Sequence, residues 1–323
     1  MELRRAPSFP EGKDSLSVLH FLEQFRTGWL TAFFTLMTAL GEETVFIAVF
    51  LIVLWCCERK YANRLFCVFF TGMFFNQLLK LVFHVPRPWI QDPTLQTVES
   101  AKAGASGYSF PSGHTQSAVG LYGSFFAVAK RRWIRGACVI VIALVGLSRL
   151  YLGVHTPYDV IASLAIGTLV LIGYHYLFRA LDKTRYGELW VLGGLCLLGV
   201  VSVSVGLLIP TLREEVLGNA CRLLGCALAM LLVAAYDRKR PVDHRALWWQ
   251  QCLKVVIGLP VFVLLKSLLK APLRALAGEA FGDGLRYCLL MIIAGIVYPC
   301  CFRLFHTKAK RRKKSPKPHE DRS

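Results

Sequence analysis

Charged residues are scarce in this sequence: 18% of its 323 residues are charged, whereas 55% are hydrophobic. Soluble domains carry about 25% charged residues on average. A chain with so few charges and a mean hydropathy of +0.48 cannot cover its apolar side chains with a polar surface, which excludes an ordinary soluble domain. The lipid bilayer is therefore the expected solvent for most of this chain.

The sequence also lacks the patterns of several other classes of protein. Its eleven cysteines never show the two-residue spacing of a zinc site, and we expect them to be reduced. No internal repeat is visible. Residues 1–15 are polar, and no small-residue cleavage site follows the first apolar stretch. A cleavable signal peptide is therefore not expected, and the first apolar stretch should remain in the protein.

Hydrophobic runs predict an all-α polytopic bundle of about ten membrane helices. An amphipathic segment near residues 18–25 leads into the first helix, and Gly41-Glu42-Glu43 should then turn the chain back. Residues 1–178 form a predicted six-helix core, 179–305 hold about four further helices of unassigned role, and 306–323 form a basic tail expected to be disordered. The predicted spans are 29–40, 44–57, 65–83, 114–129, 134–151, 157–178, 189–209, 216–235, 253–269 and 285–302.

The net charge of +18 is concentrated in alternate connections between the predicted helices. Because basic residues of membrane proteins collect on cytoplasmic loops, nucleic acid is not an expected partner. The positive-inside rule places these connections and the C-terminal tail in the cytoplasm, with the other connections on the extracytoplasmic face of a cell membrane. The basic segments are 59–64, 130–135, 179–185, 238–245 and 308–317.

On the opposite, sparsely charged side, two polar clusters flank a long connection. Lys80 and Arg87 lie at the outer end of the third predicted span, where prolines on both sides of Arg87 break the helix. Ser112, Gly113 and His114 open the fourth span. Ser112 is a suitable N-cap, and the free amides of a helix start can bind an anion.

A third cluster links the fifth and sixth predicted spans. Arg149 ends one helix, and Thr156 can cap the next, so that Asp159 lies four residues after His155 and within reach of its ring. An isolated histidine near an aspartate is usually structural. Here two histidines and three basic side chains fall on the same sparsely charged face, which favours an anion site. His20 is expected on the cytoplasmic side, away from this face.

These clusters match three signature motifs of a known family. Lys80 with Arg87-Pro88, then Pro111 to His114, then Ser148-Arg149 with His155 and Asp159, resemble the type 2 phosphatidic acid phosphatase superfamily over about residues 65–176. That superfamily also includes soluble vanadium-dependent haloperoxidases and the glucose-6-phosphatase type of membrane enzyme. From residue 179 onward we find no resemblance.

The resemblance implies a role for each motif residue. His155 would attack phosphorus and form a phosphohistidine, Asp159 would orient its ring, and His114 would act first as general acid and then as general base. The phosphoryl oxygens would be held by a set of fixed donors, so no metal and no cofactor are expected. These donors are Lys80, Arg87, Ser112, the amide of Gly113, and Arg149.

The predicted function is therefore hydrolysis of lipid phosphate monoesters or pyrophosphates by an integral membrane phosphatase. The substrate remains open among a prenyl pyrophosphate, phosphatidylglycerophosphate, phosphatidic acid and a sphingoid phosphate. Two alternatives also remain: a lipid phosphotransferase that uses the same site, and a transport or assembly protein with a vestigial site.

The connection 89–107 should cover the site. The expected partners are the lipid substrate and the bilayer; the oligomeric state is not predicted.

Overall fold

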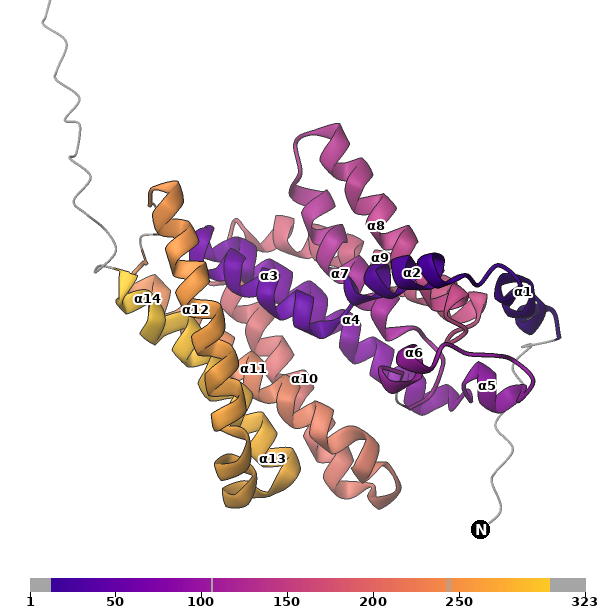
Figure 1. Ribbon diagram of the computed structural model, residues 1–323. Helices are drawn as coiled ribbons and strands as arrows, with labels where there is room; N and C mark the ends of the chain where they lie inside the picture. The colour runs from indigo at the N-terminus through magenta and orange to yellow at the C-terminus, as the bar shows by residue number, and fades with distance from the viewer. Residues whose placement is uncertain (1–12, 106, 243, 245, 303–323) are drawn as a thin grey trace, which may run out of the picture.

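The computed structural model describes residues 13–105, 107–242, 244 and 246–302, and within these residues every regular element is a helix (Figure 1). The predicted all-α bundle is confirmed, while the predicted tail 306–323 lies outside the described residues. The elements are α1 (Lys13–Glu23), α2 (Gly28–Ala39), α3 (Glu43–Cys56), α4 (Arg59–Phe83), α5 (Pro88–Gln91), α6 (Glu99–Ala103), α7 (Gly113–Val128), α8 (Arg132–Tyr151), α9 (Pro157–Leu181), α10 (Gly187–Leu208), η1 (Pro210–Leu212), α11 (Arg213–Lys239), α12 (Trp248–Leu268), α13 (Lys270–Ile292), η2 (Ile293–Val297) and α14 (Tyr298–Cys300).

Helices lie at all ten predicted positions, but fewer of them are long enough to cross a bilayer alone. Seven described helices, α4 and α8 to α13, have the length and apolar composition of a span. The bent pair of α2 and α3 raises the number to eight. α7 has 16 residues, fewer than the roughly 20 that a straight crossing needs.

The turn between α2 and α3 differs from the prediction. The two helix axes differ by 47°, so the chain bends at Gly41-Glu42-Glu43 and continues in the same general direction instead of turning back. With 12 and 14 residues, neither helix can cross a bilayer alone, but together they extend roughly 39 Å. The predicted first two spans therefore form one bent span.

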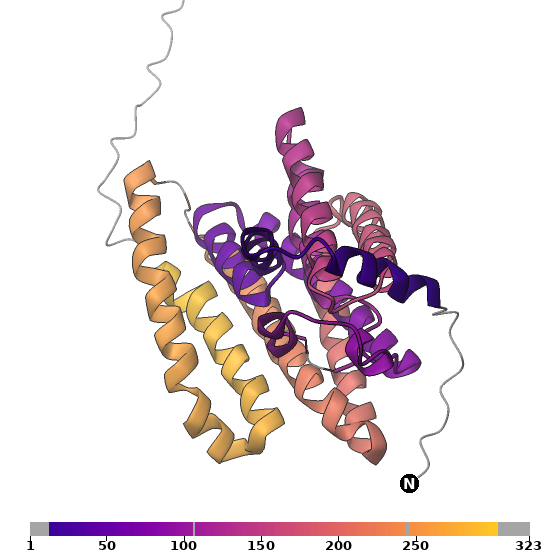
Figure 2. The ribbon, with the colours of Figure 1, turned by 45° about the vertical axis from the view of Figure 1, so that its right-hand side comes forward.

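Because this pair is one span, the N-terminal helix lies at the opposite end of the bundle from the one predicted. Nε2 of His20 on α1 lies 3.0 Å from Oδ2 of Asp92 in the connection that follows α4. Nε of Arg26 donates to the carbonyl of Tyr151 at 3.0 Å. α1 thus lies beside the α4–α7 connection (Figures 1 and 2), and the prediction that His20 lies away from the face that carries the motifs is wrong.

The other end of the bundle gathers the basic connections. Arg64 at the start of α4 donates to Asp182 after α9 at 2.5 and 2.6 Å. Arg59 lies 3.9 Å from Asp237 near the end of α11. α4 has 25 residues, which separates this end from the α4–α7 connection by roughly 37 Å.

The C-terminal helices pack against the helices that carry the three motifs. Figure 2 shows α12 and α13, in orange and yellow, along one flank, where α13 packs against α11 and α12 packs against α3. α11 approaches α13 closely, since a Cβ atom on Gly225 would meet the carbonyl of Gly284. Trp55 of α3 donates to the carbonyl of Ala294 at 2.9 Å. The predicted division of the chain after residue 178 stays a prediction.

Candidate active site

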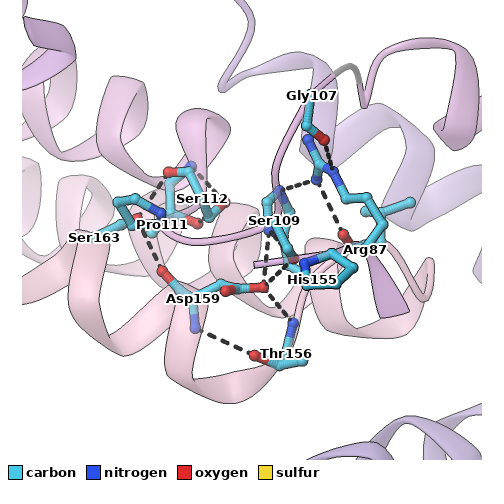
Figure 3. Close-up of polar contacts among 12 residues, drawn as sticks. Arg87, Gly107, Ser109, Pro111, Ser112, His155, Thr156, Asp159 and Ser163 are labelled. Carbon is cyan, nitrogen blue, oxygen red and sulfur yellow. Dashed lines mark hydrogen bonds and ion pairs between the residues drawn. The ribbon is translucent and has the colours of Figure 1, made fainter. Parts of the chain in front are cut away.

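The turn between α8 and α9 carries His155 and Asp159, and local hydrogen bonds hold it. Thr156 caps α9: its hydroxyl accepts from the amide of Asp159 at 3.4 Å, and its own amide donates to Oδ2 of Asp159 at 2.8 Å (Figure 3). Pro157 occupies the first helical turn, where its missing N–H costs nothing. The predicted start of this helix is confirmed, and the Asp159 carboxylate is held next to the preceding histidine.

The imidazole of His155 is oriented from both sides. Nδ1 lies 3.1 Å from Oδ2 of Asp159, and Ser109 donates to the same oxygen at 2.6 Å. Because a carboxylate only accepts hydrogen bonds, Nδ1 carries the proton and Nε2 keeps a lone pair. Nη1 of Arg87 lies 2.9 Å from Nε2 and donates to it (Figure 3). The ring therefore presents an unprotonated nitrogen to a cation.

Burial keeps this histidine neutral. The His155 side chain is 1% exposed, and burial lowers its pKa well below 6.5, with the positive charges of Arg87, Arg149 and Lys80 acting in the same direction. Removing a charge from water is unfavourable, and the nearby cations repel a proton. A neutral imidazole with a free lone pair can act as a nucleophile.

The Arg87 guanidinium is fixed by backbone carbonyls. Nε donates to the carbonyl of Gly107 at 2.9 Å, and Nη1 donates to that of Val154 at 3.2 Å. The side chain is 4% exposed, and it lies over the ring of Trp89 at 5.9 Å. The α4–α7 connection therefore folds back over the site, as predicted for residues 89–107.

Arg149 has donors that the protein leaves unused. Nη1 donates to the Thr38 hydroxyl at 2.6 Å, while Nε and Nη2 are buried and have no hydrogen-bond partner among the described residues. Unpaired donors of a buried guanidinium are costly and call for an explanation. An anion in the space beside Arg149 would satisfy them.

The electrostatic interactions place the remaining predicted residues in the same cluster. Lys80 interacts with Arg87, Arg149 and Asp159. His114 interacts with Arg149, His155, Arg87 and Lys80. The three motifs, which are far apart in the sequence, thus meet at one end of the bundle.

The start of α7 is joined directly to the start of α9. Ser112 caps α7, as predicted, and its hydroxyl accepts from Thr115. The amide of Ser112 donates to the carbonyl of Asp159 at 3.2 Å, and Ser163 donates to the carbonyl of Ser112 at 2.8 Å (Figure 3). Since the amides of Ser112 and Thr115 are used in this way, those of Gly113 and His114 are the first-turn amides left to meet an anion.

Two contributors to the site were missed. Ser109 lies just before the second motif, and nothing in its spacing indicated that it would donate to Asp159. Thr38, the partner of Arg149, lies 111 residues away in the chain, and no local pattern could have found it. In the part of the chain that the structure describes, no three His, Cys, Asp or Glu side chains form a metal-ligand group, and the prediction of a metal-free site stays a prediction.

Comparison with known proteins identifies the family. Residues 61–183 match the family model of the PAP2 superfamily, and residues 223–311 match that of the PAP2 superfamily phosphatase, transmembrane extension. The chain is 32% identical over 142 residues to undecaprenyl-diphosphatase BcrC of Bacillus subtilis. This alignment covers 43% of the present chain and 69% of BcrC. The chain is a member of the PAP2 superfamily.

Other PAP2 relatives match more of the chain. Sphingosine-1-phosphate phosphatase 1 of Rattus norvegicus is 27% identical over 270 residues, 76% of this chain and 61% of that protein, so the chain spans about three fifths of its length. Two crystal structures are also similar. Aquifex aeolicus LpxE has 25% sequence identity and a TM-score of 0.47, and the match covers 51% of this chain and 97% of LpxE. A PAP2 type phosphatidylglycerolphosphate phosphatase from Bacillus subtilis has 22% sequence identity and a TM-score of 0.46, and the match covers 53% of this chain and 88% of that protein.

The PAP2 assignment covers much of the region that resembled nothing in the sequence analysis. Residues 223–311, which include most of α11 and all of α12 and α13, match the transmembrane extension of the phosphatase superfamily, whereas α10 lies outside both matched ranges. Together with the apolar helices, this makes the chain an integral, multi-pass membrane protein.

Proposed function

We propose that this chain hydrolyses phosphate monoesters or diphosphates of membrane lipids, with His155 as the nucleophile. One observation carries the proposal: the neutral His155 ring has Nδ1 bonded to Asp159 and Nε2 directed at Arg87, the cation that would hold a phosphoryl group. This arrangement supplies both a nucleophile and charge compensation for phosphoryl transfer.

The reaction would proceed in two displacements. Nε2 of His155 attacks phosphorus, the bond to the ester oxygen breaks, and His114 gives its proton to that oxygen, so that the lipid alcohol leaves. His114 then removes a proton from water, whose oxygen attacks phosphorus. The phosphorus–nitrogen bond breaks and inorganic phosphate is released. Asp159 stabilises the positive charge on the ring while the phosphohistidine exists.

The fixed cations would compensate the charge of the phosphoryl group. The charges of Arg87, Arg149 and Lys80 all act on His155, which supports a shared role for them, and the unused donors of Arg149 suit phosphoryl oxygens. Burial, and then the same charges, oppose a proton on His114 while the site holds no anion. The negative charge of the substrate would offset them, so His114 would take up its proton as substrate binds.

A lipid phosphate is the substrate we favour, and within that class a sphingoid phosphate. The relatives that match most of the chain are named sphingosine-1-phosphate phosphatases. A relative named undecaprenyl-diphosphatase supports keeping diphosphates in the panel. We place the site on the extracytoplasmic face and the C-terminal tail in the cytoplasm, because the basic connections lie at the other end of the bundle from the site.

The test is phosphate release by the purified full-length protein in detergent. Sphingoid phosphate, phosphatidic acid, a prenyl diphosphate and glucose 6-phosphate are offered to the wild type and to His155→Ala and His114→Ala. We expect release from a lipid substrate that both substitutions abolish. Activity retained by His155→Ala would refute the mechanism, and glucose 6-phosphate as the best substrate would refute the lipid assignment. Transfer of phosphate to an added lipid alcohol instead of water would indicate a phosphotransferase.

A further inference from the structure

A cavity of about 470 Å³ lies between α3 and α4 on one side and the C-terminal helices α10 and α11 on the other. One residue of α12, Phe262, and two of α13, Tyr287 and Met291, also line it. Most of the lining is apolar, including Phe66, Phe70 and Leu223. The volume is that of a pocket for a small ligand, and the catalytic site does not use it.

One end of the cavity lies at the level of the phosphate cradle. On α4, Leu78, Leu81 and Val82 line the cavity, while Lys80 belongs to the catalytic cluster. The cavity and the catalytic cluster are therefore lined by residues of the same turn of α4.

The α2–α3 bend makes a second connection between the cavity and the site. Glu43 lines the cavity, and Gly41, two residues earlier, packs against His114. A Cβ atom on Gly41 would lie 2.8 Å from the His114 carbonyl oxygen. Glu42, between them, interacts electrostatically with Arg149. The cavity and the catalytic site therefore share a wall.

The cavity is amphipathic. Among its apolar walls stand Glu43, Gln77, Asn219 and Arg222, and Nη2 of Arg222 donates to Asn219 at 2.7 Å. Ionisable residues in membrane spans are costly and normally face a functional interior. A polar patch within apolar walls suits a ligand with a hydrocarbon chain and a polar group near one end.

The cavity also has access to the bilayer. Leu78 and Val82 line it, yet they are 41% and 57% exposed, and Phe75 on the same helix is 41% exposed. These side chains belong to an apolar span, so their exposed surface faces lipid. A hydrocarbon chain can enter sideways from the membrane.

We propose that this cavity binds the hydrocarbon chain of the lipid whose phosphate lies at His155, so that the C-terminal helices α10 and α11 determine which chain lengths are accepted. The inference rests on the proposed function and adds a specificity site to it. Apolar walls, a polar end beside the cradle and lateral access all suit one hydrocarbon chain. Val205 and Ser202 of α10 then become specificity-determining residues.

The experiment fills the cavity from α10. Val205→Trp introduces a large side chain into it, and Ser202→Phe is a second, independent filling variant, since the Ser202 hydroxyl bonds only to its own helix at Leu198. Leu207→Trp is the matched control, because Leu207 is 47% exposed and does not line the cavity. Each purified protein is assayed with a long-chain sphingoid phosphate and with a short-chain analogue that has the same headgroup.

We expect kcat/KM for the long-chain substrate to fall about tenfold or more in both filling variants, the effect of excluding methylene groups from an apolar pocket. The short-chain analogue should be hydrolysed as fast as by the wild type, and Leu207→Trp should change neither rate. Equal losses for both substrates, or no loss for either, would overturn the proposal. Because His155→Ala is assayed in parallel, a failure of the cavity proposal with intact His155-dependent hydrolysis leaves the proposed function standing.

Discussion

Nη1 of Arg87 lies 2.9 Å from Nε2 of His155 and 3.2 Å from the carbonyl oxygen of Val154, the residue that precedes His155. The guanidinium thus lies directly beside the ring nitrogen, where it would also contact an oxygen of the phosphoryl group during the reaction. A further hydrogen bond, from Nε to the carbonyl of Gly107, helps to fix the plane of the group. The cation is held in place before any substrate binds, and preorganised charge of this kind is effective in catalysis.

Arg87→Lys should therefore lower kcat about 100-fold, the loss typical of removing one preorganised donor. A lysine ammonium keeps the charge but cannot reach Gly107, Val154 and the phosphoryl group with one planar fork. The measurement is kcat for the best lipid substrate. Arg135→Lys, an exposed change at the basic end of α8, should have no effect, and an unchanged kcat in Arg87→Lys would show that charge alone suffices.

Ser109→Ala tests how the Asp159 carboxylate is oriented. The substitution removes the 2.6 Å hydrogen bond to Oδ2 and leaves the amide of Thr156 as the remaining backbone donor. We expect kcat to fall by about tenfold to 100-fold, the effect of losing an orienting partner, with KM unchanged because Ser109 would not touch the substrate. Ser109→Thr, which restores the hydroxyl, should recover activity. A rise in KM with normal kcat would contradict this positioning role.

The hydrogen-bond caps of the site were readable from the sequence, whereas its long-range contacts were not. Ser112 and Thr156 cap helices because their hydroxyl groups reach amides three residues away, a purely local relation. Thr38 and Arg149 meet only because two helices pack side by side. The chemistry of the motifs therefore came from the sequence, and the partners that orient them came from the fold.

The bend at Gly41 explains the main error in the predicted topology. Gly41-Glu42-Glu43 suits a reversal or a bend equally well, because glycine and polar residues permit both. The choice depends on packing against His114 and Val145, which local sequence does not encode. The end of the bundle assigned to each residue before Gly41 depends on this choice. His20 was therefore predicted at the wrong end of the bundle.

Activity should survive chelators. Three fixed cations in the cradle, Lys80, Arg87 and Arg149, can compensate the charge that a divalent ion would otherwise compensate. Phosphate release measured before and after dialysis against EDTA should agree within error. Loss of activity that Mg²⁺ restores would contradict the metal-free mechanism.

The contact between His20 and Asp92 should depend on pH. The hydrogen bond that the His20 ring donates to the Asp92 carboxylate raises the pKa of His20 above 6.5, so this stabilisation is complete below pH 6.5 and is lost as pH rises through the raised pKa. Hydrogen bonds from Thr94 and then His20 lower the pKa of Asp92 from 3.8 to about 2, so its contribution is present above pH 3.8 and is lost as pH falls toward 2. The contact is therefore strongest between these limits.

Histidine ring NMR can check this prediction. The His20 resonance should titrate above pH 6.5 in the wild type and move toward 6.5 in Asp92→Asn, which keeps the size of the side chain but removes its charge. A His20 titration that does not move would mean that α1 is not held to Asp92 in solution.

Gly41→Ala should impair catalysis more than stability. A Cβ atom at this position would lie 2.8 Å from both the His114 carbonyl oxygen and Cγ1 of Val145, so α3 and the start of α7 must move apart by a few tenths of an ångström or more. His114 would then shift relative to His155, and small displacements of a catalytic group can cost about 100-fold in rate.

Gly136→Ala on α8 is the matched control, because its Cβ would meet open space and alanine favours a helix by up to about 1 kcal/mol. We expect kcat to fall only in Gly41→Ala, with thermal unfolding changed by no more than a few degrees in either protein. Equal kcat values in the two variants would show that the bend does not position His114.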